Sequence, residues 1–205
     1  MPRSVSHRPV QAAHQALLLE VEPPLPAGMT YVESFIDAAE EAALIAHVER
    51  LPLRCARYKE YTAQRRTAAF GAVFDFEGNR MVDAPTIPAF LLPLRARVAC
   101  LAALREDAFV HALVTEYSTG AALGWHRDVG AFAVVAGVSL GSACRMRLRP
   151  YPPPSGRNGP RVNLELAPRS AYVLRDEVRW AWEHCVPPTP ALRYSITFRT
   201  LRAPA

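Results

Sequence analysis

The chain has 205 residues, of which 50% are apolar, so it is long enough to bury one core and we expect one all-β or mixed domain. Its formal net charge is +5, but Lys59 is the only lysine and the positive charge is almost all arginine, which favours an acidic partner only modestly. No apolar run approaches the ~20 residues that a membrane-spanning helix needs, and residues 1–15 lack the layout of a signal peptide, so the pattern excludes a helical membrane protein.

Cysteine usage agrees with this expectation. Four cysteines occur without C-x-x-C spacing and without a secretory signal ahead of them, which is typical of reduced thiols with structural roles; they are Cys55, Cys100, Cys144 and Cys185. We therefore expect a soluble, cytoplasmic protein that has no membrane partner and is a monomer.

Residues 1–28 carry little pattern and are rich in proline towards their end, which predicts an extended lead-in before a single domain over residues 29–205. The first periodic segment runs from Asp37 to Arg50 and has one apolar stripe. Asp37 and Glu40 resemble a capping box, and Pro52 follows the predicted end of this packing helix. A second helix is expected from about Pro88 to about Leu104.

Residues 54–66 mix basic and aromatic side chains, which predicts a loop or an edge strand. A strand is predicted from Phe70 to Phe76, entered through Gly71, with a turn over residues 77–79. We expect residues 54–80 together to form a lid that recognises the substrate.

From Phe109 onward, short apolar runs separated by glycine predict an all-β region. A strand over residues 143–149 would place Cys144, Met146 and Leu148 on its core face and three arginines on the other. The complete set of predicted strands is 109–117, 131–140, 143–149, 162–166, 171–175, 178–184 and 192–201.

The most informative pattern is His126-x-Asp128 followed by His184. Two imidazoles and one carboxylate form the facial triad of non-haem iron(II) oxygenases, which leaves three coordination positions open. An extended backbone would put His126 and Asp128 on the same side, and His184 is the only later histidine. His111 is the competing third ligand, although its apolar neighbours are equally typical of a core imidazole.

Two arginines near the end of the chain, Arg193 and Arg199, suggest the co-substrate. A dicarboxylic 2-oxo acid that chelates iron still has charged carboxylate oxygens, and a guanidinium pairs with these better than an ammonium does. The set predicts an oxygenase site that uses 2-oxoglutarate.

These residues stand in an order that closely resembles the AlkB family of iron(II)- and 2-oxoglutarate-dependent dioxygenases, from about Glu33 to Arg202. The matching segments are Thr115-Glu116-Tyr117, Gly120, Gly124 to Asp128, Val138 to Gly141, Trp182-Glu183-His184 and, most specifically, Arg193 to Arg199. The resemblance implies an α+β, mainly β fold: a double-stranded β-helix (jelly roll) core with the N-terminal helices packed on one sheet. It also implies a reaction with dioxygen that removes N-methyl groups and releases formaldehyde and succinate.

By position, the resemblance implies that His126, Asp128 and His184 bind iron. It implies that Arg193 and Tyr117 hold the distal carboxylate of 2-oxoglutarate and that Arg199 supports the carboxylate beside the keto group. Ser195 is implied to face the same pocket, which Val138 and Ile196 either line or merely support as core residues.

The string Arg65 to Gly71 resembles the lid segment of nucleic-acid demethylases. Arginines can meet phosphates while an aromatic ring stacks on a flipped base, so the expected substrate contacts are Tyr61, Arg65, Arg66 and Phe70. Phe74 is a further aromatic candidate, and Phe70 and Phe74 are equally well explained as core residues.

The chain departs from the pattern of repair members at two positions. Thr115 stands where they often have asparagine, and Gly130 stands where an acidic residue often reads the target base. Three functions therefore remain open: an N-demethylase of alkylated DNA or RNA, a protein demethylase or hydroxylase with the same core, and a non-catalytic binding module. The intact triad with both arginines argues against the last.

Overall fold

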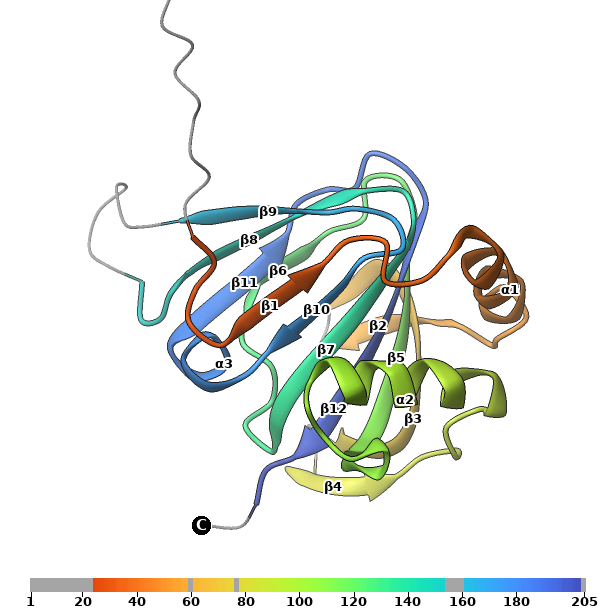
Figure 1. The fold of residues 1–205 in the computed structure, drawn as a ribbon, viewed down its shortest axis with the longest axis horizontal. Helices are drawn as coiled ribbons and strands as arrows, with labels where there is room; N and C mark the ends of the chain where they lie inside the picture. Colours follow the sequence, from red (N-terminus) through yellow and green to blue (C-terminus); the bar gives the residue numbers. More distant parts are fainter. Residues whose placement is uncertain (1–23, 59–60, 76–77, 154–160, 204–205) are drawn as a thin grey trace, which may run out of the picture.

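The structure, a computed structural model, describes residues 24–58, 61–75, 78–153 and 161–203, without the side chains of residues 56–63. Two antiparallel sheets lie face to face (Figure 1). The large sheet has eight strands in the order β1 (Met29–Val32), β10 (Ala171–Leu174), β7 (Phe132–Gly141), β12 (Arg193–Leu201), β5 (Phe109–Tyr117), β3 (Tyr61–Asp75) and β2 (Arg54–Tyr58), and β4 (Arg80–Asp83) pairs with β3. The small sheet has the order β6 (Leu123–His126), β11 (Trp182–Val186), β8 (Cys144–Pro150) and β9 (Val162–Leu166). This arrangement confirms the mainly β fold.

Alternation along β12 divides the large sheet into two faces. Tyr194, Ile196 and Phe198 are buried in a core on the outer face, away from the small sheet. The residues between them, Arg193, Ser195, Thr197 and Arg199, point to the inner face, because successive side chains of a strand alternate. Strand β12 thus contributes alternate side chains to the core and to the inner face, where the expected co-substrate residues lie.

Two helices cover the outer face: α1 (Ala38–Val48) and α2 (Leu92–Leu101), which follows the short η1 (Ala89–Leu91) (Figure 1). Their buried residues include Leu44 and Val98, in the same core as the outer residues of β12. The predicted capping box is present, since Asp37 accepts from the Glu40 backbone N–H and Glu40 accepts from that of Asp37. Helix α2 ends three residues earlier than predicted.

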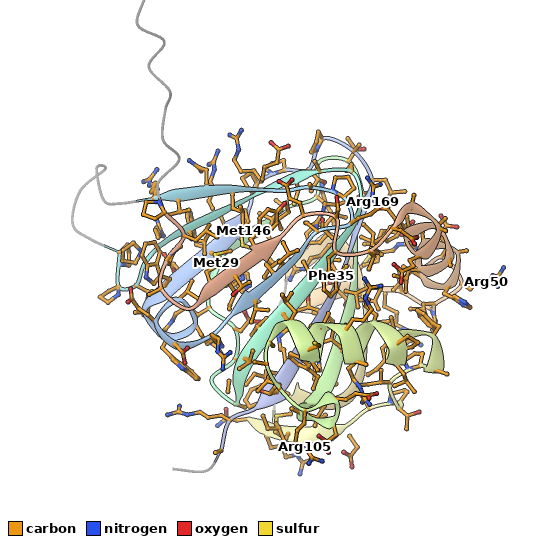
Figure 2. All side chains as sticks on the ribbon, viewed as in Figure 1. Met29, Phe35, Arg50, Arg105, Met146 and Arg169 are labelled. Atoms are coloured by element: carbon orange, nitrogen blue, oxygen red, sulfur yellow. The ribbon has the colours of Figure 1, made fainter. Side chains whose placement is uncertain are left out.

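A second core lies between the sheets. Cys144, Met146 and Leu148 of β8 are buried there while the intervening arginines face outward, which confirms the predicted alternation. Figure 2 labels Met146, which belongs to this core, and Met29, which is partly buried and packs against it.

The described parts of segment 54–66 lie on β2 and β3, which pair with each other, and β2 is an edge strand of the large sheet, as one of the two expectations had it; residues 59–60 lie outside the described residues. Strand β3 begins well before Phe70, so Gly71 is not its entrance. At Gly71 the strand leaves β5 and begins to pair with β4. A Cβ there would lie 2.0 Å from Val110 O, and φ is +77°, so only glycine fits.

The prediction of a strand over 178–184 was wrong in its first half. Residues Asp176–Ala181 form helix α3, and β11 begins only at Trp182. The alternating apolar residues Val178, Trp180 and Trp182 imitate a strand. Strands β1, β4 and β6 were not predicted, and the short η2 (Glu106–Ala108) precedes β5.

Among the described residues, no helix is long and apolar enough to cross a membrane. All four cysteines are free.

Candidate metal and co-substrate site

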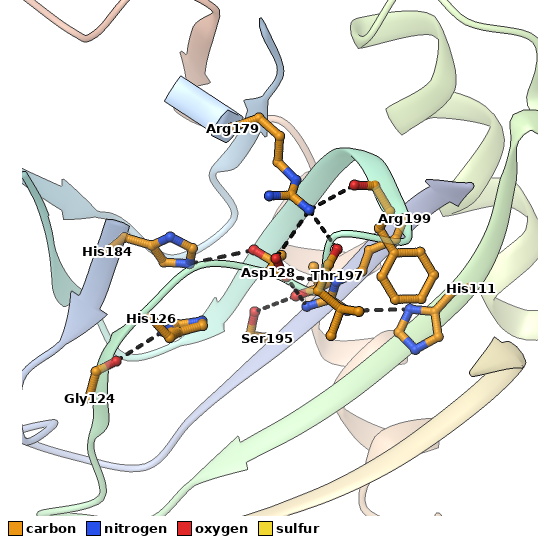
Figure 3. A network of polar contacts seen from close by, with 11 residues as sticks. His111, Gly124, His126, Asp128, Arg179, His184, Ser195, Thr197 and Arg199 are labelled. Carbon is orange, nitrogen blue, oxygen red and sulfur yellow. Dashed lines mark hydrogen bonds and ion pairs between the residues drawn. The ribbon is translucent and has the colours of Figure 1, made fainter. Parts of the chain in front are cut away.

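Strand pairing brings the two histidines together. His126 ends β6 and lies directly opposite His184 of β11, with their ring centroids 4.3 Å apart. Asp128 lies two residues beyond the end of β6, in a loop rather than on the extended strand that was expected. Its Oδ2 is 3.8 Å from His184 Nε2, and one ligand atom from each of the three residues lies within 4.8 Å of the others (Figure 3). The described residues contain no other group of this kind.

The protonation of these groups suits a cation. His126 Nδ1 is 2.9 Å from Gly124 O, and because a carbonyl only accepts, Nδ1 carries the hydrogen and leaves Nε2 free as a ligand. Burial, reinforced by the charge of His126, lowers the pKa of His184 to about 3, so this ring is neutral. Burial alone would raise the pKa of Asp128, but Arg199 and the two imidazoles hold it well below its usual range. The set offers two imidazole rings and one carboxylate.

Arg199 fixes the carboxylate of Asp128. Its Nε and Nη2 both contact Asp128 Oδ1, at 2.8 and 2.7 Å. Its Nη1 lies 3.3 Å from Nδ1 of His111, and since a guanidinium only donates, Nδ1 accepts. Burial, followed by the charge of Arg199, lowers the pKa of His111 to about 3. His111 is therefore a neutral support for Arg199 and not a member of the metal-ligand group.

Arg179 holds the loop that carries Asp128, and the sequence did not indicate this role. Its Nη2 donates to the carbonyl oxygens of Asp128, Val129 and Phe132 at 3.2, 2.7 and 2.7 Å (Figure 3). The residue is 3% exposed, and burial lowers the pKa of its guanidinium. Its place on α3, where a strand was predicted, explains why it was missed.

Arg193 is a second buried cation on the inner face. It is 2% exposed, its Nη2 donates to Ser139 Oγ at 2.9 Å, and its guanidinium lies 5.0 Å from the centroid of the Tyr117 ring. Its Nε is buried and has no hydrogen-bond partner. Two other arginines of the described residues, Arg95 and Arg179, share that property, but Arg193 stands in a row with the hydroxyl groups of the inner face. An unpaired buried N–H beside a buried positive charge suits a carboxylate ligand.

The other expected co-substrate residues lie beside Arg193. Tyr117 is opposite it on β5, and Ser195 pairs with Thr115 on one side and Ser139 on the other. Burial raises the pKa of Tyr117 in spite of the nearby Arg193 charge, so the phenol stays protonated. Val138 and Ile196 belong to the outer core, so the structure supports the packing explanation for both.

Comparison with known proteins decides the family. Residues 28–199 match the model of the 2OG-Fe(II) oxygenase superfamily. The chain belongs to this superfamily. Over 185 residues the oxygenase is 29% identical to the "Alkylated DNA repair protein ALKBH8 homolog" of Arabidopsis thaliana, a match that covers 78% of this chain and 51% of the relative. The chain thus spans about half the length of that relative.

Solved structures support the same fold. The structure of OsALKBH1 superposes with a TM-score of 0.65 at 15% identity and covers 87% of this chain and 99% of its own. A Pseudomonas putida prolyl-4-hydroxylase superposes with a TM-score of 0.57 at 16% identity, covering 86% and 94%. This member of the 2OG-Fe(II) oxygenase superfamily has a double-stranded β-helix core and is similar to AlkB homologues. Its family uses Fe(II), 2-oxoglutarate and dioxygen, and the His126, Asp128 and His184 donors and the unpaired Arg193 Nε fit these requirements.

The expected lid residues whose side chains are described do not all lie on the same face of the large sheet. Phe70 is 8% exposed within the helix-covered core, so its ring is not free to stack on a base. Arg66 is opposite Glu116 and binds both of its carboxylate oxygens, at 2.7 and 2.6 Å, on the outer face. Arg65, the neighbouring residue, lies on the inner-face side, and its charge acts on Tyr117. The side chain of Tyr61 lies outside the described residues, and Phe74 pairs opposite Met81 between β3 and β4.

Tyr172 is a further inner-face residue that the sequence did not indicate. It pairs with Gly137 of β7, which in turn pairs with Thr197 of β12. A Cβ at position 137 would lie 2.4 Å from Tyr172 Cζ, so glycine makes room for this ring. Burial raises the pKa of the Tyr172 phenol, with a further contribution from the Asp128 charge.

We expect Arg179→Met to weaken Fe(II) binding about 10- to 100-fold, the range observed when groups that orient metal ligands are removed. The reason is that the Asp128 loop loses three hydrogen bonds to its carbonyl oxygens. Anaerobic calorimetric titration with Fe(II) measures this directly. Arg175→Met is the matched control, because Arg175 lies in the same segment and donates to Ala102 O instead. Equal affinities in the two variants would show that the loop needs no such support.

Proposed function

We propose that this chain holds Fe(II) with His126, Asp128 and His184, binds 2-oxoglutarate with Arg193, and oxidatively demethylates alkylated DNA or RNA bases. The observation that carries the proposal is the convergence of the three donors beside a buried arginine whose Nε lacks a partner. When bound, iron and 2-oxoglutarate supply an oxidant derived from dioxygen. Hydroxylation of a methyl carbon that is bonded to nitrogen gives a hemiaminal, which collapses and releases formaldehyde.

The chain's own residues contribute position and charge in this scheme. Arg199 and Arg179 fix Asp128 through its carboxylate and its backbone carbonyl respectively, so the negative ligand stays in one place. Arg193 and Ser139 offer N–H and O–H groups to the distal carboxylate, supported by Tyr117. All three guanidinium nitrogens of Arg199 already contact Asp128 or His111. The expected contact of Arg199 with the other carboxylate of 2-oxoglutarate therefore remains a prediction.

The substrate class rests on two supports. The Arabidopsis relative is described as an alkylated DNA repair protein, and the net charge of +5 favours a polyanion. The alternative is a protein side-chain demethylase or hydroxylase, because the same core occurs in a prolyl-4-hydroxylase.

Formaldehyde release from a panel of N-methylated oligonucleotides and N-methylated peptides tests the proposal. We expect release from at least one methylated oligonucleotide, in step with succinate formation and dependent on added Fe(II), because the oxidised methyl carbon has no other fate. Asp128→Ala serves as the inactive control. Release from methylated peptides alone would assign the chain to protein substrates. Succinate formation without formaldehyde from any methylated probe would point to a hydroxylase.

A further inference from the structure

Four exposed residues gather beside the Asp128 loop, and the site described above uses none of them. They are Arg127, Tyr151, Trp180 and Arg202, which we call the basic aromatic surface. The Arg127 guanidinium lies 3.8 Å from the centroid of the Tyr151 ring, and its Nη1 donates to Trp180 O at 3.1 Å. The Arg202 guanidinium lies 4.9 Å from the centroid of the Trp180 ring, and the buried Arg179 guanidinium lies 4.4 Å from the same centroid. Contacts between segments distant in sequence therefore assemble the surface.

The surface is next to the metal-ligand group. Arg127 stands between His126 and Asp128 in the chain, and the Arg202 backbone N–H donates to Ala131 O at 2.8 Å in the same loop. Trp180 follows Arg179, which donates to Asp128 O. A molecule bound here would pass alongside the three ligands.

Both rings are unusually open for their size. Tyr151 is 43% exposed and Trp180 is 37% exposed, and they are two of only five large apolar side chains in the described residues with such exposure. Large aromatic rings left partly in water next to a site are typical of surfaces that meet a partner. Stacked guanidinium groups hold the rings in place.

The positive charge of the surface is not neutralised by the protein. Neither Arg127 nor Arg202 forms an ion pair with a described residue, whereas eight other arginines do; these are Arg66, Arg95, Arg97, Arg105, Arg149, Arg169, Arg175 and Arg199. The nearest acidic residues along α3 are already engaged. Asp176 pairs with Arg175, and Glu177 accepts from the Trp182 indole. The guanidinium edges remain available as donors.

We propose that the basic aromatic surface binds the nucleic-acid strand that flanks the target base, with the arginines on phosphates and the two rings against neighbouring bases. This inference rests on the proposed function. An acidic protein would satisfy the arginines but give the aromatic faces no stacking partner, whereas a single strand satisfies both. A guanidinium stacked on a ring also keeps its N–H groups pointing outward, where they can contact phosphate oxygens.

The test is fluorescence anisotropy of the full chain with a labelled, unmodified oligothymidylate over a range of KCl concentrations. Trp180→Ala should weaken binding by about 30-fold, the middle of the range for loss of one stacked base, while Trp180→Phe should retain most of the affinity. Arg202→Gln should reduce the slope of log affinity against log salt by about 0.7, the value for one phosphate contact on a single strand. Arg50→Gln is the matched control, because this exposed arginine follows α1 on the helix-covered side (Figure 2).

Each result has a definite meaning. Succinate formation in the absence of substrate should be unchanged in Arg202→Gln and Arg50→Gln, since neither side chain contacts the metal ligands, Arg179 or Arg193 in the described structure. Unchanged oligonucleotide affinity in Trp180→Ala and Arg202→Gln would overturn the proposal. If polyglutamate bound as tightly as the oligonucleotide, and Arg202→Gln abolished that binding, the surface would be assigned to an acidic protein instead. The oligonucleotide carries no methyl group, so its binding is measured independently of demethylation. A failed demethylation assay would therefore not decide whether this surface binds nucleic acid.

Discussion

Replacing Asp128 with alanine should abolish Fe(II)-dependent turnover of 2-oxoglutarate. Removing a group that only orients a ligand costs about 10- to 100-fold, so removing the charged ligand itself is expected to cost more than about 100-fold. Asp128 is also the one carboxylate among the three donors, and two imidazoles alone bind a divalent cation less well than the complete set does.

The same substitution has a structural cost that must be measured separately. The Asp128 side chain is 6% exposed and is paired with Arg199, so alanine leaves a buried guanidinium without its carboxylate. Such a loss typically destabilises a protein by about 3–5 kcal/mol, which is a large share of the ~5–15 kcal/mol that stabilises a domain. Urea unfolding of the variant gives this number before any assay is interpreted.

Asp128→Asn separates the two effects. An asparagine keeps an oxygen that can accept from Arg199, but it lacks the negative charge that a metal ligand supplies. We expect this variant to fold with a smaller loss of stability and still to fail in succinate formation. Undiminished succinate formation by either folded variant would reject the assignment of the site.

The sequence predicted the three metal-ligand residues because two of them, His126 and Asp128, are close together in the chain. His126-x-Asp128 is visible in the sequence, but the pairing that brings His184 opposite His126 spans 58 positions and depends on the sheet register. The motif nevertheless does not lie on one strand. Asp128 reaches the group from a loop, and the hydrogen bonds of Arg179 and Arg199 hold it there.

The lid contacts were harder to predict because a shift of one residue moves a side chain to the opposite face of a sheet. Arg65 and Arg66 are chemically alike, yet only Arg66 falls opposite Glu116 and joins the outer face. Phe70 lies on that same face and is covered by the helices. Composition could identify a basic and aromatic segment, but only the register of β3 against β5 decides which members face the pocket.

Arg193→Ala should raise the KM for 2-oxoglutarate far more than Arg65→Ala does. Truncating one partner of a buried, hydrogen-bonded charge pair costs about 2–5 kcal/mol, which corresponds to an increase of roughly 30-fold or more. Arg193 is 2% exposed and has an unpaired Nε, so a carboxylate that meets it is well removed from water. Arg65 is only partly buried, and its contribution should be screened by solvent.

Arg193→Lys makes this comparison specific. A lysine keeps the charge but presents a single ammonium, so it cannot donate to Ser139 Oγ and to both oxygens of a carboxylate in the planar geometry of a guanidinium. We expect an intermediate KM with little change in the turnover number at saturating 2-oxoglutarate, because the metal ligands are untouched. Steady-state succinate formation over a range of 2-oxoglutarate concentrations measures both quantities. Equal KM increases in Arg193→Ala and Arg65→Ala would place the co-substrate elsewhere on the inner face.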